Sequence, residues 1–527
     1  MNRRDFIQKT VPLSFLPFFI GGYSIKAFGR SPFLESLISA ATETNNVLVL
    51  IQLNGGNDGL NTVLPIDQYS NLSNARSNIL IAENKILKLT NATGLHPAMT
   101  GMKKLYDSGK LSVVQSVGYP NPNFSHFRAT DIWLTASDSN QHETSGWMGR
   151  YLSDQNEFPE YPTGYPNSVM PDPLAIQIGS VISSGLQGYS ANMGMAITSP
   201  TNFYQFISNT VDPAPNTPAG HELTYIRQVA QQTNLFAGTI KNAAAKATNK
   251  STLYPVAPDN SLGDQLKIVA RLIAGGLKTR IYIVSIGGFD THSIQAVAGE
   301  TETGTHANLL RRLSSAIEAF QDDIKLLGAE DRVLGMTFSE FGRRIKSNSS
   351  GGTDHGSAAP LFLFGKNVKS GILGSNPIIS SSVSANDNVP MQYDFRSVYA
   401  SVLKSWFGVP DAELQRVLFK NFQSLPIITS TNIATHDDVK PNRFELFQNY
   451  PNPFNPSTKI RFNSSGSNLT LKVYDMTGKE IQTIAEGNYP SGSHEVTFSA
   501  NGLPSGIYYY RLQSGSYTEM KAMTLVK

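Results

Sequence analysis

Runs of consecutive apolar residues recur through the longer, N-terminal part of this chain. They lie at 47–53, 111–117, 280–286, 332–338 and 361–364. Because apolar residues follow one another instead of alternating with polar ones, the runs predict strands buried on both faces. Residues 97–109, 264–277 and 306–327 carry apolar positions three and four apart, which predicts amphipathic helices. The repeated order of strand, loop, helix and strand predicts an α/β domain, with a mostly parallel sheet flanked by helices.

The predicted α/β domain spans residues 45–425 and contains one long stretch with a weaker pattern. Residues 138–265 are rich in Pro, Gly, Ser and Asn. We predict an insertion of loops and short helices, including helices at 222–235 and 264–277, that caps the edge of the sheet carrying the site.

The character of the chain changes after residue 425. Residues 426–442 are rich in Thr, Asn and Asp and predict a linker. Short strands then follow within residues 443–527, separated by turns that contain glycine. They are expected at 469–474, 480–484, 494–498, 506–512 and 519–526. Regularly spaced short strands of this kind predict a small C-terminal β-sandwich.

Composition and charge narrow the class of protein. A length of 527 residues predicts two or three domains, and 40% hydrophobic with 16% charged residues is typical of a folded globular protein. The formal net charge of +3 is too small to indicate a nucleic-acid partner. The chain has no cysteine, which excludes disulfides, thiolate metal ligands and a cysteine nucleophile.

The first 30 residues predict an export signal. Arg3 and Arg4 are followed by Phe6, Lys9 and an apolar run at 11–23. This order resembles a twin-arginine signal peptide, a route that carries proteins already folded. The alternative is a short basic start to a buried helix. The apolar run is about 13 residues long, shorter than the ~20 that span a bilayer, so we expect no transmembrane span in the mature protein.

Polar side chains follow four of the five predicted strands. They are Asp58 after 47–53, Ser125 after 111–117, Asp290 and His292 after 280–286, and Glu340, Asp354 and His355 after 332–338. Since the carboxyl ends of parallel strands meet at one edge of a sheet, we expect these groups to gather there. Carboxylate oxygens and imidazole nitrogens are ligands for divalent metals, so the pattern predicts a metal-dependent site.

Several of these residues have a second interpretation. Asp58 lies in an Asn/Asp/Gly sequence that also forms ordinary turns. Ser125 is either a nucleophile with Arg128 as an anion-binding neighbour, or a loop serine bonded to its own backbone. His306 opens a predicted helix and is either a ligand or a plain polar residue of the first turn. Asp394 is predicted to cap a helix.

The C-terminal sandwich resembles a known sorting domain. The resemblance is carried by residues 449–456 (Asn-Tyr-Pro-Asn-Pro-Phe-Asn-Pro), 473–479 (Val-Tyr-Asp-Met-Thr-Gly-Lys) and 503–508 (Leu-Pro-Ser-Gly-Ile-Tyr). These motifs are similar to those of the sorting domain of the type nine secretion system of Gram-negative bacteria. The resemblance implies passage across the outer membrane, to the cell surface or the medium, with the type nine machinery as partner. The N-terminal signal adds the twin-arginine machinery as a second expected partner.

Residues 45–410 resemble a large family of exported bacterial proteins of unknown function. The motifs are 54–61 (Asn-Gly-Gly-Asn-Asp-Gly-Leu-Asn), 125–127 (Ser-His-Phe), 288–292 (Gly-Phe-Asp-Thr-His), 339–343 (Ser-Glu-Phe-Gly-Arg) and 352–356 (Gly-Thr-Asp-His-Gly). The family looks like a branch of the alkaline phosphatase and sulfatase superfamily. By position, the resemblance implies roles around one or two divalent metals, zinc, calcium or magnesium, for Asp58, Ser125, Asp290, His292, Glu340 and His355.

Some positions depart from the superfamily's pattern. Asp290 and His292 are closer in sequence than its usual Asp and His, and Glu340-Phe341 stands where an Asp-His pair is usual. Ser125 is not followed by the Pro and Arg of a sulfatase motif. The resemblance therefore carries the fold further than the activity.

The expected function is that of an exported metal-dependent hydrolase of phosphate or sulfate esters, acting on a small anionic ester or a glycan. Ser125 or a bound water is the expected nucleophile, and Arg128 or Arg343 would hold the anion. The alternative is a non-catalytic surface binding protein with the same fold. A redox enzyme is disfavoured, because no Gly-x-Gly-x-x-Gly follows the first strand and no cysteine can bind a cluster.

Overall fold

The computed structural model describes residues 18–20, 23–25, 45–153, 158, 161–168, 170–200, 217, 235–256, 259–429 and 445–526, the last with gaps at 447–448, 450–451, 453, 465, 491 and 516. The chain forms two compact units, Met1–Thr431 and Asn432–Lys527, and each is described by itself.

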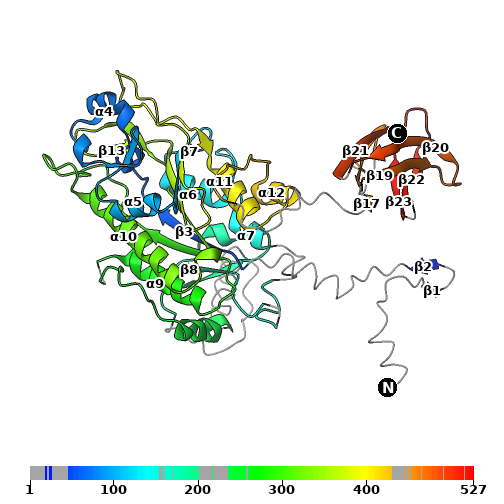
Figure 1. The fold of residues 1–527 in the computed structure, drawn as a ribbon, viewed down its shortest axis with the longest axis horizontal. Helices are drawn as coiled ribbons and strands as arrows, with labels where there is room; N and C mark the ends of the chain where they lie inside the picture. The colour runs from blue at the N-terminus through cyan, green and yellow to red at the C-terminus, as the bar shows by residue number, and fades with distance from the viewer. Residues whose placement is uncertain are drawn as a thin grey trace. The chain divides into compact units, whose positions relative to one another are not determined.

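A mixed, mainly parallel sheet forms the centre of the first unit (Figure 1). Its strand order is β15-β7-β14-β11-β3-β10-β8-β9, and β16 pairs with β7. The strands are β3 (Val47–Leu53), β7 (Leu111–Gly118), β8 (Ala175–Ile178), β9 (Gly194–Ile197), β10 (Ile281–Ile286), β11 (Val333–Phe338), β14 (Ala359–Phe364), β15 (Gly371–Leu373) and β16 (Tyr393–Asp394). Only β14 runs against its neighbours β11 and β7 among these described strands. The predicted fold class is confirmed.

The continuous apolar runs are explained by the position of β3. It lies between β10 and β11, and Leu50 is paired with Ile283 on one side and with Met336 on the other. Both faces of the strand are covered by protein, so its side chains point into the core whichever way they face. Each of the five predicted runs forms a strand of this sheet.

Helices cover both faces of the sheet (Figure 1). One layer contains α5 (Thr100–Asp107), α9 (Ser261–Ala274) and α10 (Thr305–Leu326), and the other contains α6 (His126–Thr135), α7 (Trp147–Leu152), α11 (Phe395–Ser401) and α12 (Asp411–Leu418). Trp133 of α6 stacks between Phe338 of β11 and Phe395 of α11, which fixes α6 over the sheet. The predicted cap of α11 is confirmed, because the Asp394 carboxylate accepts a bond from Arg396 N–H.

Shorter elements connect these layers. They are α3 (Gly59–Thr62), α4 (Tyr69–Arg76), the three-stranded sheet of β4 (Val63–Pro65), β5 (Leu87–Lys88) and β6 (Thr93–Leu95), and the hairpin of β12 (Arg343–Ser347) and β13 (Thr353–His355). In the hairpin, Arg343 lies directly opposite His355. Two motifs of the sequence are thereby brought together at one point.

The segment 138–265 contributes more than the predicted loops and short helices. Its strands β8 and β9 extend the central sheet, with Ile176 paired to Tyr282 of β10. Each is only four residues long and is surrounded by Pro, Gly and Ser, so the pattern gave no sign of a core strand. The helix predicted at 264–277 is present as α9, and the one predicted at 222–235 lies outside the described residues except for residue 235.

The second unit consists of two antiparallel sheets. One has the order β17-β18-β21 and the other β20-β19-β22-β23. The strands are β17 (Glu445–Leu446), β18 (Ser457–Ser464), β19 (Ser467–Tyr474), β20 (Glu480–Tyr489), β21 (Gly492–Ser499), β22 (Gly506–Ser514) and β23 (Tyr517–Leu525). Apolar side chains of both sheets, such as Phe462 and Tyr510, share one core. This arrangement confirms the predicted β-sandwich.

The two predicted connecting segments are only partly described. Ile427 and Ile428, at the start of the predicted linker, are buried and pair with the segment around Val368, so they belong to the first unit. Residues 430–442 lie outside the described residues, as does the predicted signal peptide except for the antiparallel strands β1 (Phe18–Ile20) and β2 (Tyr23–Ile25). The twin-arginine signal stays a prediction.

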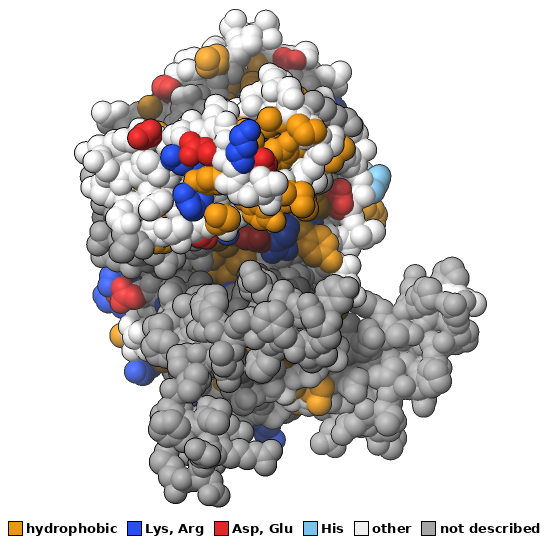
Figure 2. All heavy atoms as spheres, turned by 90° about the vertical axis from the view of Figure 1, so that its right-hand side faces the viewer, with side chains coloured by type: hydrophobic (Ala, Val, Ile, Leu, Met, Phe, Trp, Pro, Cys, Tyr) orange, Lys and Arg blue, Asp and Glu red, His pale blue; other side chains and the backbone are white. Residues whose placement is uncertain are grey.

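The surface has mixed charge on the face drawn in Figure 2. Acidic and basic side chains lie interspersed among the described residues there, as the small net charge of the sequence would suggest. Within the described part of the chain, no helix combines the length and the apolar character that crossing a bilayer requires.

Candidate metal centre

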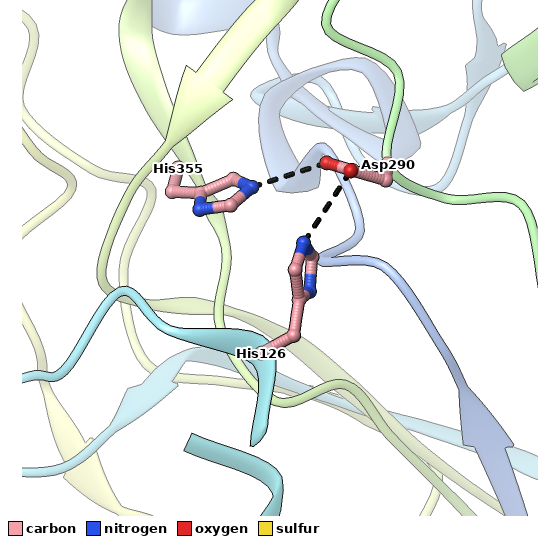
Figure 3. A group of neighbouring side chains, drawn as sticks. All are labelled: His126, Asp290 and His355. Carbon is pink, nitrogen blue, oxygen red and sulfur yellow. Dashed lines mark hydrogen bonds and ion pairs between the residues drawn. The ribbon is translucent and has the colours of Figure 1, made fainter. Parts of the chain in front are cut away.

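Two segments that follow strands of the central sheet, and the β12–β13 hairpin, bring ligand-type side chains together. His126 begins α6 after β7, Asp290 follows β10, and His355 ends β13 (Figure 3). One ligand atom from each of these three residues lies within 4.8 Å of the other two. The predicted convergence of Asp290 and His355 is therefore present, together with His126, which was not among the predicted ligands.

A fourth side chain, His292, lies against the same carboxylate. Asp290 Oδ1 lies 3.1 Å from His355 Nε2 and 3.1 Å from His292 Nε2, and Asp290 Oδ2 lies 3.4 Å from His126 Nε2. The Nε2 atoms of His292 and His355 are 2.9 Å apart. Three imidazoles thus direct the same ring nitrogen toward one carboxylate.

The partners of the other ring nitrogens identify the tautomers. His355 Nδ1 lies 2.8 Å from the carbonyl oxygen of Phe124, which can only accept. Nδ1 of His126 lies 2.8 Å from Glu340 Oε1, and Nδ1 of His292 lies 3.2 Å from Asp354 Oδ1. Each Nδ1 therefore carries the proton and donates it, which leaves a lone pair on each Nε2.

Lone pairs that face a carboxylate repel it unless a cation or a proton lies between them. The chemistry of this donor set, three imidazole nitrogens and one carboxylate oxygen, fits a borderline divalent metal such as zinc. The anchoring of each Nδ1 by an oxygen is also the arrangement that orients histidines at metal sites. The residues present therefore fit a metal centre.

Glu340 was predicted as a ligand, and the structure gives it a different position. Its side chain is buried and accepts from Gly55 N–H at 2.8 Å, from the Ser339 hydroxyl at 3.3 Å and from His126. Held by these donors, Glu340 orients the His126 ring from behind. Asp354, also predicted as a ligand, has the same relation to His292.

The Phe341 ring packs against two histidines of the centre. Its ring centroid lies 5.0 Å from that of His126 and 4.5 Å from that of His355, and the residue is buried. A Cβ atom on Gly56 would lie 2.3 Å from this ring, so the glycine is needed for the close approach. The Gly55-Gly56 and Glu340-Phe341 motifs are thus explained as one packed contact.

Arg343 was predicted to hold a substrate anion, but its guanidinium is buried and already bonded. It donates to the carbonyl oxygens of Gly55, Gly56, Phe289 and Thr353, and to Asp290 Oδ1 at 2.6 Å. It therefore joins three loops of the centre instead of facing solvent. Burial would raise the pKa of Asp290, but the bond and the charge of Arg343 lower it to about 2.

Asp58, another predicted ligand, is not part of the group formed by Asp290 and the three histidines, and it is wholly buried. Both its oxygens accept from Arg76 Nη1 at 2.9 Å, and Oδ2 accepts from Gln295 Nε2 at 2.6 Å. Burial would raise the pKa of Asp58, and the Arg76 charge holds it below its usual value. The carboxylate is thus neutralised by an arginine from α4, a partner that nothing in the sequence indicated.

Ser125 and Arg128 lie at the start of α6. Ser125 is the N-cap residue and is exposed, and its side chain makes no capping bond to the helix. Arg128 pairs with Asp131 and donates to the carbonyl oxygens of Asp138, Ser139 and Gln141. It therefore holds the loop after α6, and in this conformation its donors are not directed at an anion.

Two further histidines lie outside the centre. His306 is buried on α10, with Nε2 3.0 Å from Asn57 Oδ1, and burial lowers its pKa to about 4. His96 lies edge-on to it, with 6.2 Å between ring centroids. The interpretation of His306 as an ordinary polar residue of the helix start agrees with this position.

His126 is the member of the centre that sequence reasoning missed. It is adjacent to Ser125 in the Ser-His-Phe motif at 125–127, and it follows a core strand as the other candidates do. An imidazole at a strand exit was therefore a usable signal. The direction of the His126 side chain depends on the residue at which α6 begins, and hydrophobic periodicity does not locate that residue to within one position.

Comparisons with known proteins locate two families on the chain. Residues 448–526 match the family described as secretion system C-terminal sorting domain, which confirms the predicted sorting domain and marks the chain for export to the cell surface or the medium. Residues 118–418 match the family described as protein of unknown function (DUF1501). No curated protein matches this chain.

Similar solved structures include an alkaline phosphatase superfamily protein from Vibrio parahaemolyticus, at 11% identity over 83% of this chain and 81% of that one, with a TM-score of 0.33. The PsFucS1 sulfatase from Pseudoalteromonas sp. is 11% identical over 88% and 86%, with a TM-score of 0.31.

A third similar structure is PorZ, a surface component of the type-IX secretion system of Porphyromonas gingivalis. It is 15% identical over 19% of this chain and only 14% of PorZ, with a TM-score of 0.13.

The family match at residues 118–418 covers more than half of the 527 residues, so the chain belongs to the DUF1501 family of proteins of unknown function.

Proposed function

We propose that this chain is an exported metal-dependent hydrolase of phosphate or sulfate esters. The observation that carries the proposal is the set of three imidazoles whose Nδ1 atoms are anchored and whose Nε2 atoms face Asp290. His126, Asp290, His292 and His355 would hold the cation. Nitrogen-rich ligation favours zinc or a similar transition metal over calcium or magnesium, which prefer oxygen ligands.

A divalent cation at such a site polarises an ester oxygen and lowers the pKa of a bound hydroxyl group. The chain's own residues have separate tasks. Asp290 stays ionised at neutral pH because Arg343 donates to it and is charged. Glu340 and Asp354 keep His126 and His292 in the tautomer that presents Nε2. Ser125, adjacent to His126, is the proposed nucleophile, with water as the alternative.

The charge of the substrate anion would be met mainly by the cation. Arg343 and Arg128, the two candidates from the sequence, already donate hydrogen bonds to carbonyl oxygens and to carboxylates. We therefore assign neither guanidinium to the substrate. Replacing Arg128 is expected to change turnover little, whereas replacing Arg343 is expected to disturb the centre itself.

The test uses the purified full-length chain. Metal content is measured by elemental analysis, and turnover of aryl phosphates and aryl sulfates is measured before and after chelation and again after zinc is restored. His355→Ala is expected to lose both metal and turnover, and His142→Ala, at an exposed loop histidine, is expected to keep both. A wild-type chain that binds no divalent metal and turns over no ester at any pH would refute the proposal.

The second candidate is a non-catalytic binding protein displayed at the surface. It is favoured by one observation, the absence of an available guanidinium at Arg128 and Arg343. A chain that binds metal and an anionic ester or glycan without turning it over would support this candidate. Loss of a measured turnover in Ser125→Ala, with metal content unchanged, would exclude it.

A further inference from the structure

The ligands of the centre come from two segments that share one buried contact. Thr291 lies between Asp290 and His292, and Thr353 immediately precedes Asp354 and His355. Both threonine hydroxyls donate to the same atom, Oε1 of Gln295, at 3.0 and 2.9 Å. A single amide oxygen therefore joins the loop after β10 to the β12–β13 hairpin.

The other side of the Gln295 amide is held equally firmly. Nε2 donates to Asp58 Oδ2 at 2.6 Å, and the Asp58 charge is balanced by Arg76. Arg76 in turn donates to the backbone oxygens of Arg344 and Ile345 in β12. Because a carboxylate only accepts and the two hydroxyls donate to the opposite end, the orientation of the amide is determined.

The backbone of Gln295 adds to the same connection. Its N–H donates to the Gly351 carbonyl at 2.9 Å, and its carbonyl accepts from His306 N–H. The side chain is buried, so water cannot replace these bonds at low cost. A Cβ atom on Gly352 would lie 2.4 Å from the His292 backbone, which shows how closely the two segments approach.

We infer that Gln295 is a positioning residue for the metal centre. Its amide sets the separation between the segment that carries Asp290 and His292 and the segment that carries His355, without touching the cation. The buried Asp58–Arg76 pair anchors the amide from behind, which gives this pair a role in the centre although neither residue belongs to it. The part of this inference that concerns metal rests on the proposed function.

Two variants separate the bonds involved. Gln295→Leu removes both ends of the amide. Gln295→Glu keeps an acceptor for the two threonines but removes the donor to Asp58 and introduces a second carboxylate beside it. Gln321→Leu is the matched control, because Gln321 is also a buried glutamine but lies near the C-terminal end of α10.

The experiment on the full-length chain has two measurements. Hydrogen–deuterium exchange of the metal-free protein reports on residues 287–296 and 351–357, and calorimetric zinc titration with the visible spectrum of the cobalt-loaded protein reports on the centre. Both Gln295 variants are expected to raise exchange in these two segments selectively. They are also expected to weaken zinc binding about 10- to 100-fold and to alter the cobalt spectrum, with Gln321→Leu unchanged.

The outcomes separate the inference from the proposed function. Unchanged exchange in the two segments, or an equal rise over the whole first unit, would overturn the role of Gln295. Selective exchange without any effect on zinc affinity or on the cobalt spectrum would overturn it as a positioning residue for the centre. If the wild-type chain binds neither zinc nor cobalt, the proposed function fails. The exchange data then still decide whether Gln295 joins the two segments.

Discussion

Asp58 and Asp290 satisfy the same sequence criterion and end in opposite environments. Each follows a core strand and each bonds to an arginine. Asp58 is fully buried and is neutralised by Arg76, whereas 46% of the Asp290 side chain is exposed and three imidazoles face it. The role of a carboxylate at a strand exit is therefore decided by the partners that distant segments bring to it.

The comparison also separates stability from chemistry. A buried ion pair with complete hydrogen bonding contributes to a unique packing, and removing one partner is costly. An exposed carboxylate among imidazoles contributes little to folding and, in the proposed function, would bind the metal. We expect substitutions at the two sites to differ in which property they change.

The largest expected effect is on folding at the Asp58 site. Arg76→Met leaves a buried carboxylate without its cation, so we expect the free energy of unfolding to fall by about 3–5 kcal/mol. Chemical denaturation followed by circular dichroism measures the change. The double variant Arg76→Met/Asp58→Asn should recover part of the loss. A single variant within about 1 kcal/mol of wild type would contradict the account.

The pH dependence of stability should come from the buried region. Burial holds the pKa of His306 near 4, below the ~6.5 of an unfolded chain. The unfolded state therefore binds more protons between these values, so stability is complete above pH 6.5 and declines as pH falls toward 4. The loss is on the order of 3 kcal/mol.

Denaturation midpoints measured between pH 7 and pH 4 test this prediction. His306→Gln should flatten the profile, although His96, whose pKa burial lowers to about 3, retains part of the slope. Asp58, Arg76 and Arg343 also face His306. A profile of His306→Gln that coincides with that of the wild type would count against the assignment.

A smaller effect is expected at Glu340, which orients His126 from behind the centre. Glu340→Gln keeps the shape but replaces the carboxylate that fixes the tautomer. Zinc affinity is expected to fall about 10- to 100-fold, or roughly 1.4–2.7 kcal/mol. Calorimetric titration measures the zinc affinity. The control is Glu330→Gln, because Glu330 precedes β11 and Glu340 follows it. Equal affinities for wild type and Glu340→Gln would show that Glu340 does not orient the ring.

The smallest expected effect on folding is at Asp290. Asp290→Asn keeps an acceptor for Arg343, whose carbonyl partners at Gly55, Gly56 and Thr353 remain. We expect a change of about 1 kcal/mol in unfolding free energy, together with loss of metal binding. A loss of stability as large as that of Arg76→Met would remove the distinction between the two carboxylates.

Most of the fold followed from the periodicity of the sequence. The long apolar runs predicted the core strands, and the stripe from Leu309 to Phe320 predicted the buried face of α10. The antiparallel direction of β14 and the membership of β8 and β9 in the sheet were not predictable in this way. Both depend on pairing with distant strands, which local pattern does not encode.

Three of the four residues of the centre were predicted, because polar residues that come after core strands meet at one edge of the sheet. Asp290, His292 and His355 lie close together as expected, because β10, β11 and the hairpin end at the same edge. The roles of His126 and Gln295 depend on hydrogen bonds to residues more than 50 positions away. No spacing rule reveals such bonds, and the same holds for the pairing of Asp58 with Arg76 on a separate helix.

The most direct test of the central claim is a crystal structure of the zinc-loaded chain with anomalous diffraction measured at the zinc edge. The account predicts a single strong peak about 2.0–2.1 Å from the Nε2 atoms of His126, His292 and His355 and close to an oxygen of Asp290. A peak beside Asp58 instead, or no peak at this edge of the sheet, would contradict it.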